Sequence, residues 1–471
     1  MITLKDVCFQ YSADSTVQAL RHIDLTIQDG ECVVLTGESG CGKTTLTRCL
    51  NGLVPSFYEG ELTGGLLLDE KNLLEMPQYE ISRHVGTVFQ DPRSQFFTVD
   101  STDEVAFGCE NLSMSTEKIN QNIQKAFHNL RIEALKDCSL FALSSGERQK
   151  LAVAAIYAMD TPVLVLDEPS ANLDLETMEV LRGILQELKR EGKTIIVSEH
   201  RLSYLMGVAD RYVYIQDGEI KQIWTPRQAE ELSKAERKAL GLRSFQSISL
   251  ADIAKEGAPA EQGKRIEGRG LAVRLDKTEV FRGLTFIFQW GPAGKVVGIT
   301  GNNGSGKTTF AKMLCGLLKP SEGALLFDGK PAAAKERLRQ TYFVMQDTDY
   351  QLFTESVRHE LELAERKNHR PCDMELILER MGLSQAAERH PLSLSGGQKQ
   401  RVTIAAAMAS GSDILVLDEP TSGLDGRNMQ RLKETILALK KQGKLIFVVT
   451  HDMEFLDGIY DEVMSFAQKI R

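Results

Sequence analysis

Hydrophobic positions along the chain fall into two kinds of segment that alternate. Short apolar runs rich in β-branched residues occupy 32–36, 163–166 and 194–197, and such runs are typical of strands buried on both faces. Longer stretches such as 176–191 repeat apolar residues at the spacing of one helix face. This alternation predicts an α/β fold with a parallel sheet.

The second half of the chain repeats the first. Four strings recur in the same order, beginning at Gly37 and Gly301, Leu143 and Leu394, Val163 and Ile414, and Thr194 and Leu445. The two copies are 264 positions apart at Lys43 and Lys307, 256 apart at Gln90 and Gln346, and 251 apart at every later pair. A constant offset over several motifs indicates a duplicated domain.

The segment between the copies differs from both of them. It has helical pieces followed by a break rich in glycine, proline and alanine, KEGAPAEQGKR, which suits a partly ordered linker. We therefore expect a first domain over 1–227, a linker over 228–265 and a second domain over 266–471.

Composition excludes several classes of protein. The 471 residues are 42% hydrophobic and carry a formal net charge of -9, which argues against a broad basic face for nucleic acid. The eight cysteines are scattered without a CxxC pair and are expected to be reduced thiols. No apolar run approaches the roughly 18 residues that span a bilayer, and the first residues lack the apolar core of a signal peptide. We expect neither secretion nor a membrane span.

Each copy carries a glycine-rich loop of the pattern GxxxxGK[ST]. The loop follows a strand-like run and precedes a helical pattern, the context in which backbone N–H groups wrap phosphates. Lys43 and Lys307 are expected to reach the β- and γ-phosphates of ATP, and Thr44 and Thr308 to hold Mg²⁺. The predicted nucleotide-binding residues in the two loops are Gly37, Glu38, Ser39, Gly40, Cys41, Gly42, Lys43, Thr44 and Thr45, with Gly301, Asn302, Asn303, Gly304, Ser305, Gly306, Lys307, Thr308 and Thr309.

An Asp-Glu pair ends a hydrophobic strand in each copy. Asp167 and Asp418 are predicted to assist the magnesium ion. The adjacent Glu168 and Glu419 are placed to polarise an attacking water.

A glutamine and a histidine close further apolar runs in both copies. Gln90 and Gln346 are predicted to ligate magnesium or the water and to sense the γ-phosphate. His200 and His451 each lie 33 residues beyond their aspartate. The shared spacing suggests a contact with the γ-phosphate that holds water and glutamate in line.

The strings LSSGE and LSGGQ place a Ser-Gly turn at the start of a helix, which is another anion site. The residues predicted to contact nucleotide there are Ser144, Gly146, Ser395, Gly396, Gly397 and Gln398. Within one domain a second phosphate site has no obvious use. It becomes useful when the turn of each domain closes over the nucleotide of the other.

Together these motifs resemble the ATP-binding-cassette (ABC) ATPases, whose phosphate loop, Q-loop, signature, Asp-Glu pair and switch histidine all occur twice here. The resemblance covers nearly the whole chain apart from the linker. It implies two tandem domains, each with a RecA-like parallel-sheet core, an antiparallel β subdomain and a helical signature subdomain.

Within that superfamily, the stretch VGTVFQDPRSQFFTVDSTDEVAFGCENL resembles the ATPases of energy-coupling-factor (ECF) vitamin and metal transporters. The second copy, VMQDTDYQLFTESVRHEL, keeps the Q-loop and QLF but loses the proline and the AFG-EN part. The resemblance implies two membrane partners, a transmembrane coupling component and a substrate-binding component. It also implies a place on the cytoplasmic face of the cell membrane.

The copies are not equivalent, so we predict two competent but unequal sites. Ser145 replaces a glycine of the signature turn and Glu147 replaces a glutamine; we expect the serine to reduce backbone freedom and the carboxylate to repel phosphate mildly. Tyr11 lies where an aromatic ring can stack on adenine, whereas its counterpart is Leu275. After the Q-loops, Phe96, Phe97, Leu352 and Phe353 either line a groove for a partner helix or belong to the local core.

The leading hypothesis is an ATPase that energises uptake through an ECF-type transporter of a vitamin, a vitamin precursor or a transition metal. The fused halves are expected to pair head to tail within one chain. Two alternatives stay open: a fused sugar-import ABC ATPase, and a twin-cassette protein that acts on ribosomes. The transported compound is not encoded in motifs of this kind.

Overall fold

The computed structural model of the protein describes residues 1–12, 18–171, 173–253, 263–275, 278–366 and 372–466. The chain divides into two compact units, Met1–Ser247 with Asp425–Arg427, and Ile248–Leu424 with Asn428–Arg471. Each unit contains a parallel sheet, an antiparallel sheet and a set of helices. No helix in the described part of the chain combines the length and apolar character needed to cross a bilayer.

The first unit is built on a six-stranded sheet in the order β10-β9-β3-β8-β7-β6. All neighbouring strands run parallel except β10 and β9. The strands are β3 (Cys32–Thr36), β6 (Val85–Val88), β7 (Val163–Asp167), β8 (Thr194–Ser198), β9 (Arg211–Gln216) and β10 (Glu219–Trp224). The central strands β3, β7 and β8 are buried along their whole length, as their unbroken apolar sequence predicts.

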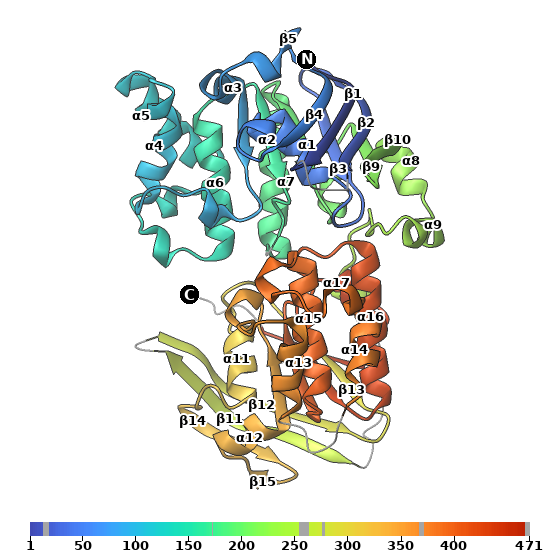
Figure 1. Ribbon diagram of the computed structural model, residues 1–471. Helices are drawn as coiled ribbons and strands as arrows, with labels where there is room; N and C mark the ends of the chain where they lie inside the picture. The colour runs from blue at the N-terminus through green and yellow to red at the C-terminus, as the bar shows by residue number, and fades with distance from the viewer. Residues whose placement is uncertain (13–17, 172, 254–262, 276–277, 367–371, 467–471) are drawn as a thin grey trace. The chain divides into compact units, whose positions relative to one another are not determined.

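An antiparallel sheet in the order β2-β1-β4-β5 covers the phosphate-loop side of this core. Its strands are β1 (Ile2–Tyr11), β2 (Gln18–Ile27), β4 (Gly60–Leu68) and β5 (Lys71–Asn72). Apolar side chains from β1, β2 and β4 pack with β3 and with helix α1 (Lys43–Leu50) in one core cluster. In Figure 1 these strands are the blue elements at one side of the first unit.

The remaining helices of the first unit are α2 (Leu53–Ser56), α3 (Gln78–His84), α4 (Ser101–Asn111), α5 (Thr116–Asn129), α6 (Ser145–Ala158), α7 (Leu175–Arg190), α8 (Pro226–Glu231) and α9 (Lys234–Ala239). They pack on both sides of its core, α2 and α3 with α1 on the phosphate-loop side, and α4 to α8 on the other side. Helix α6 packs against α4 and α5, and its long run of alanines and valines is buried. This layer is the helical signature subdomain that the motifs imply.

The second unit repeats the plan. Its parallel sheet has the order β16-β17-β18-β13-β19, and its antiparallel sheet has the order β12-β11-β14-β15. The strands are β11 (Lys264–Leu275), β12 (Thr278–Trp290), β13 (Lys295–Thr300), β14 (Glu322–Phe327), β15 (Lys330–Pro331), β16 (Thr341–Val344), β17 (Ile414–Asp418), β18 (Leu445–Val449) and β19 (Glu462–Ser465). The helices are α10 (Leu250–Ile253), α11 (Lys307–Leu314), α12 (Ala334–Gln340), α13 (Val357–Glu365), α14 (Met374–Arg380), α15 (Gly396–Ala409), α16 (Gly426–Lys441) and α17 (Met453–Leu456).

The α/β fold with a parallel sheet, an antiparallel sheet and a helical layer in each half is confirmed. The segment predicted as a linker is partly built into the first unit. Leu242 and Phe245 are buried in its core, and the Tyr214 hydroxyl donates to the Leu240 carbonyl over 3.0 Å. The first unit consequently extends to Ser247. Most of the predicted glycine-proline-alanine break lies outside the described residues.

Candidate functional site

The phosphate loop of the first unit joins β3 to α1. Its two flanking glycines have positive φ, 147° at Gly37 and 110° at Gly42. A Cβ atom at Gly37 would lie 2.1 Å from the carbonyl oxygen of Ile215, so only glycine fits this close approach. The loop of the second unit has the same form, with φ of 144° at Gly301 and 100° at Gly306.

Both phosphate-loop lysines point back into their own loops. The Lys43 ammonium donates to the carbonyl oxygens of Gly37 and Glu38 over 3.1 and 3.0 Å. Lys307 makes the equivalent bonds to Gly301 and Asn302 over 2.8 and 2.9 Å. Each ammonium thus lies inside the loop whose backbone the motif uses to wrap phosphate.

The strand-end aspartates lie next to the first turn of the phosphate-loop helix. The Thr44 hydroxyl donates to Asp167 Oδ1 over 3.3 Å, and Thr308 hydrogen-bonds Asp418 in the second unit. Burial raises the pKa of Asp418 to about 6, against the lowering effects of Thr308 and Lys307. Burial, followed by the charge of Glu168, also raises the pKa of Asp167.

These oxygen-bearing side chains fit a magnesium ion. Mg²⁺ takes oxygen ligands and keeps several waters. Asp418 Oδ1 is buried and has no hydrogen-bond partner among the described residues, which is costly unless another group uses it. The hydroxyl of Thr308 and the carboxylate of Asp418 are therefore suitable groups to hold Mg²⁺ directly or through water.

In the first unit, three predicted residues come together at the end of β7. Glu168 accepts a hydrogen bond from Gln90 Nε2 over 2.8 Å and lies 3.4 Å from Nε2 of the buried His200. Burial opposes ionisation of Glu168, but the charges of His200 and Lys43 hold its pKa below the ordinary value. The carboxylate is thus kept ionised, as a base that polarises water must be.

In the second unit, the equivalent glutamate is held differently. Glu419 Oε1 is 2.9 Å from His451 Nδ1, and Glu419 Oε2 accepts from the Thr450 hydroxyl over 3.1 Å. Both glutamates have positive φ, 46° at Glu168 and 47° at Glu419. A left-handed glutamate at the same point of both copies is backbone strain of the kind that accumulates at functional sites.

The signature residues lie at the N-termini of α6 and α15. Ser144 and Ser395 are the N-cap residues, and each forms a reciprocal capping box with Glu147 or Gln398. A Cβ atom at Gly396 would meet nothing within 4 Å, and Gly396 has no positive φ. The expectation that Ser145, its counterpart, reduces backbone freedom is therefore wrong, because the position is an ordinary first helical residue with open space.

A pair of polar residues that the sequence did not single out shapes each Q-loop. The Gln95 side chain accepts from the Phe89 backbone N–H over 3.1 Å, and Gln351 accepts from Met345 over 2.9 Å. The buried Glu104 accepts from the backbone of Phe97 and Thr98, and Glu360 repeats this for Phe353 and Thr354. The 256-residue offset, which also relates Gln90 to Gln346, was the signal that could have found both pairs.

These glutamates hold the backbone that determines which side chains point inward after each Q-loop. Phe96 packs against the core of the first unit, and Leu352 is buried in the second. Phe97 and Phe353 are 75% and 73% exposed. Phe96 and Leu352 therefore belong to the local core. Phe97 and Phe353 lie on the surface, where a partner helix could contact them.

Tyr11 lies against the phosphate-loop helix. Its hydroxyl is 3.0 Å from the Thr45 hydroxyl and accepts from Arg48 over 3.1 Å. The counterpart Leu275 is an exposed side chain. Stacking of adenine on Tyr11 stays a prediction.

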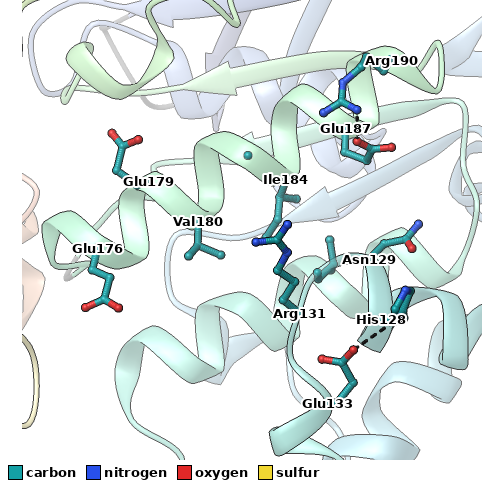
Figure 2. A pocket seen from close by; sticks show the side chains of 12 residues that line it. His128, Asn129, Arg131, Glu133, Glu176, Glu179, Val180, Ile184, Glu187 and Arg190 are labelled. Atoms are coloured by element: carbon teal, nitrogen blue, oxygen red, sulfur yellow. Dashed lines mark hydrogen bonds and ion pairs between the residues drawn. The ribbon is translucent and has the colours of Figure 1, made fainter. Parts of the chain in front are cut away.

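A surface hollow of the first unit lies elsewhere, between the end of α5 and one face of α7 (Figure 2). Val180 and Ile184 are among its apolar lining residues, and acidic and arginine side chains line the rest of it. One of these acids, Glu133, lies 3.2 Å from His128. None of the predicted nucleotide or magnesium residues lines it. We assign it no ligand.

Comparison with known proteins places this arrangement in a family. A family model described as ABC transporter matches residues 20–171 and 290–422. A "Putative ABC transporter ATP-binding protein" of Treponema denticola is 41% identical over 98% of this chain and 95% of its own length. A Bacillus subtilis protein, "Putative HMP/thiamine import ATP-binding protein YkoD", is 32% identical over 98% of this chain and 89% of its own length. The solved structure of "RNase-L Inhibitor" superposes with a TM-score of 0.67 at 22% identity, over 98% of this chain and 87% of that one, a likeness of fold alone.

Proposed function

The chain belongs to the ABC transporter family and is an ATPase of that family, and from this we propose that it energises uptake through an ECF-type transporter. ATP and Mg²⁺ are the cofactors of the family. The observation that carries the proposal is that each unit holds a complete set of phosphate-loop lysine, strand-end aspartate, glutamate and histidine around one loop.

The chemistry assigned to each residue follows from its position. Lys43 and Lys307 bind the β- and γ-phosphates, and Glu168 and Glu419 polarise the attacking water. His200 and His451 orient these glutamates over 3.4 and 2.9 Å. Thr44 with Asp167 and Thr308 with Asp418 would hold Mg²⁺, which when bound would stabilise the phosphate charge electrostatically. Gln90 contacts Glu168 and so links the state of the site to the Q-loop.

We further propose that the two halves work head to tail within one chain. A helix N-terminus attracts anions, and Ser144 and Ser395 stand at such N-termini. Each would complete the nucleotide site of the other half when ATP closes the pair. Hydrolysis would then reopen it.

The ECF assignment rests on two kinds of support. The segment after the first Q-loop resembles that of ECF ATPases, and Glu104 of its EVAFG string is a buried residue that holds the loop. The name of the Bacillus subtilis relative indicates import of HMP or thiamine. A vitamin or vitamin precursor is therefore the favoured class of substrate, and a transition metal stays within the proposal.

The same segment supplies a surface for a membrane partner. Phe97 and Phe353 are held outward by backbone bonds to Glu104 and Glu360, and exposed aromatic side chains are typical anchors for a partner helix. We propose that these two residues contact the transmembrane coupling component at the cytoplasmic face of the membrane.

The test is affinity purification of the full chain from native membranes in mild detergent, with every co-purifying protein identified. The proposal predicts two small, strongly hydrophobic proteins in stoichiometric amounts. The double variant Phe97→Ser/Phe353→Ser should lose them, whereas Phe57→Ser, at a residue 72% exposed outside the Q-loop segments, should retain them. Recovery of ribosomal proteins instead would favour the ribosome-acting alternative, and recovery of large permease subunits the sugar-import one.

A further inference from the structure

Three side chains of different chemistry meet on the antiparallel sheet of the first unit, away from the phosphate loop. They are Asp6 and Cys8 on β1 and His22 on β2, two strands that lie side by side (Figure 1). One ligand atom from each lies within 4.8 Å of the other two, and among the described residues no other group of three such side chains does this. Within the group, His22 Nδ1 is 2.6 Å from Asp6 Oδ1 and 3.9 Å from Cys8 Sγ.

Two of these residues hold a backbone conformation that strains any side chain. Asp6 and His22 have positive φ, 51° and 46°, a conformation in which glycine is the unstrained residue. Both lie at irregularities of the β1–β2 pairing. Asp6 lies between the pairs Leu4–Leu25 and Val7–Ile23, and His22 lies between the pairs Val7–Ile23 and Phe9–Leu20.

The second copy uses the unstrained residues at the same places. Its pair Leu271–Leu284 corresponds to the pair Val7–Ile23 of the first copy. Gly270 is therefore the counterpart of Asp6, and Gly283 is the counterpart of His22. These glycines have φ of 55° and 71°, so the backbone is the same. Ala272 then stands where the first copy has Cys8.

A hydrogen bond confirms this correspondence. The Asp6 N–H donates to Asp24 Oδ1 over 2.9 Å, and the Gly270 N–H donates to the Thr285 hydroxyl over 3.1 Å at the matching position of β12. The second copy therefore forms the same backbone with glycine, alanine and glycine at these three positions. The first copy replaces all three with groups that bind metals.

We propose that Asp6, Cys8 and His22 form a binding site for a divalent transition metal such as Zn²⁺ or Co²⁺. Imidazole, thiolate and carboxylate are the ligand set that these borderline metals accept, and Zn²⁺ bonds of about 2.0–2.3 Å require ligand atoms about 3.3–3.8 Å apart. The 2.6 Å between Asp6 and His22 has to open slightly, and the site is exposed enough for water to supply the fourth ligand.

Proton balance follows from the geometry. Binding releases the thiol proton of Cys8 and the Nδ1 proton that His22 shares with Asp6, so that His22 presents Nδ1 to the metal while one proton stays on Nε2. The His22 backbone N–H donates to Cys8 Sγ over 3.2 Å, which holds the sulfur beside the imidazole ring. The site is separate from the ATP-bound Mg²⁺ and from any transported substrate, so it does not rest on the transport proposal.

The test is a Co²⁺ titration of the full, untagged, metal-free chain without nucleotide, followed by thiolate-to-cobalt absorption in the near ultraviolet and by Zn²⁺ competition. The wild type should show this absorption saturating at one Co²⁺ per chain. Cys8→Ser should remove it, and Asp6→Gly and His22→Gly should each weaken Co²⁺ binding by tenfold or more. Cys138→Ser, at another partly exposed cysteine, should leave it unchanged.

The triple variant Asp6→Gly/Cys8→Ala/His22→Gly carries the residues of the second copy, so it should melt at least as high as the wild type while it fails to bind Co²⁺. Absence of thiolate-to-cobalt absorption in the wild type would overturn the proposal. So would absorption that survives Cys8→Ser, or binding that is unaffected by Asp6→Gly and His22→Gly.

Discussion

At the scale of single residues, the two predicted bases sit in unlike surroundings. Glu168 is bonded by the Gln90 amide and lies 3.4 Å from His200, whereas Glu419 is bonded by Thr450 and lies 2.9 Å from His451. The second copy has a hydroxyl donor, Thr450, where the first copy has Glu199. The two sites should therefore turn over at different rates.

Removing one base at a time tests this inequality. General-base catalysis contributes about 10²–10⁴-fold, so Glu168→Gln/Glu419→Gln should lower steady-state ATP hydrolysis by about 100-fold or more. The single variants Glu168→Gln and Glu419→Gln should retain clearly different residual rates. Equal residual rates in a phosphate-release assay would contradict the predicted inequality.

Asp418 predicts a pH-dependent stability. Its pKa is raised to about 6 from 3.8, so the nucleotide-free protein carries a destabilising charge above pH 6 that is relieved as pH falls from about 6 toward 3.8. Asp418→Asn should therefore stabilise the nucleotide-free chain at pH 8 by up to about 3 kcal/mol, with a smaller gain at pH 5. Thermal melts at the two pH values measure it, and an equal gain at both would count against the buried charge.

Residue identities in the nucleotide site were predictable because the chemistry repeats at fixed spacing. Lys43, Asp167 and His200 were found this way. The structure places Lys43 in its own loop, Asp167 beside Thr44 and His200 beside Glu168, and their roles stay predictions. The roles of Glu104 and Gln95 in holding the Q-loop were not predicted. Both recur in the second copy, but recurrence does not show which backbone N–H groups a side chain accepts from. Thr450 was missed because it does not repeat, since Glu199 stands at its place in the first copy.

At the scale of elements, the signature turn and the phosphate loop make opposite demands on glycine. Gly396 starts α15 with open space around it, whereas Gly301 has a φ of 144° and would place a Cβ 2.6 Å from the carbonyl oxygen of Phe466. The backbone does not require glycine at position 396, and Ser145 occupies the equivalent position of the first copy without strain. Glycine at position 301 is a requirement of the fold.

Two substitutions within the second unit separate these cases. Gly396→Ser should change the free energy of unfolding by no more than about 0.5 kcal/mol, as surface changes usually do. Gly301→Ala should cost about 2 kcal/mol or more, because it adds both strain and a close contact. Denaturant unfolding measures both, and a comparable loss for Gly396→Ser would show that the turn is tighter than its geometry indicates.

Elements were predictable where burial decides the pattern. The runs 32–36, 163–166 and 194–197 coincide with β3, β7 and β8 to within one residue, and 176–191 matches α7 with a shift of one. The irregular pairing of β1 with β2 was not predicted, although the apolar alternation changes parity there, from Ile2 and Leu4 before Asp6 to Val7 and Phe9 after it. The docking of residues 240–247 on the first unit also depends on tertiary contacts such as Tyr212 with Phe245.

At the scale of the whole molecule, one chain carries two copies of the same ATPase domain, and the residues around the two candidate sites differ. The duplication was plain from the offsets, and the family follows from it. The transported compound is not identified by either copy, because in the proposed assembly a separate membrane component binds it. The transported compound therefore has to be identified by measuring uptake.

The most direct measurement is uptake of labelled HMP, thiamine, Co²⁺ and Ni²⁺ by cells in which the chain is replaced by Glu168→Gln/Glu419→Gln. The account predicts that uptake of one of these compounds is lost while the variant still co-purifies with its membrane partners in wild-type amounts. Unchanged uptake of all four, with ATP hydrolysis abolished in the purified variant, would contradict it.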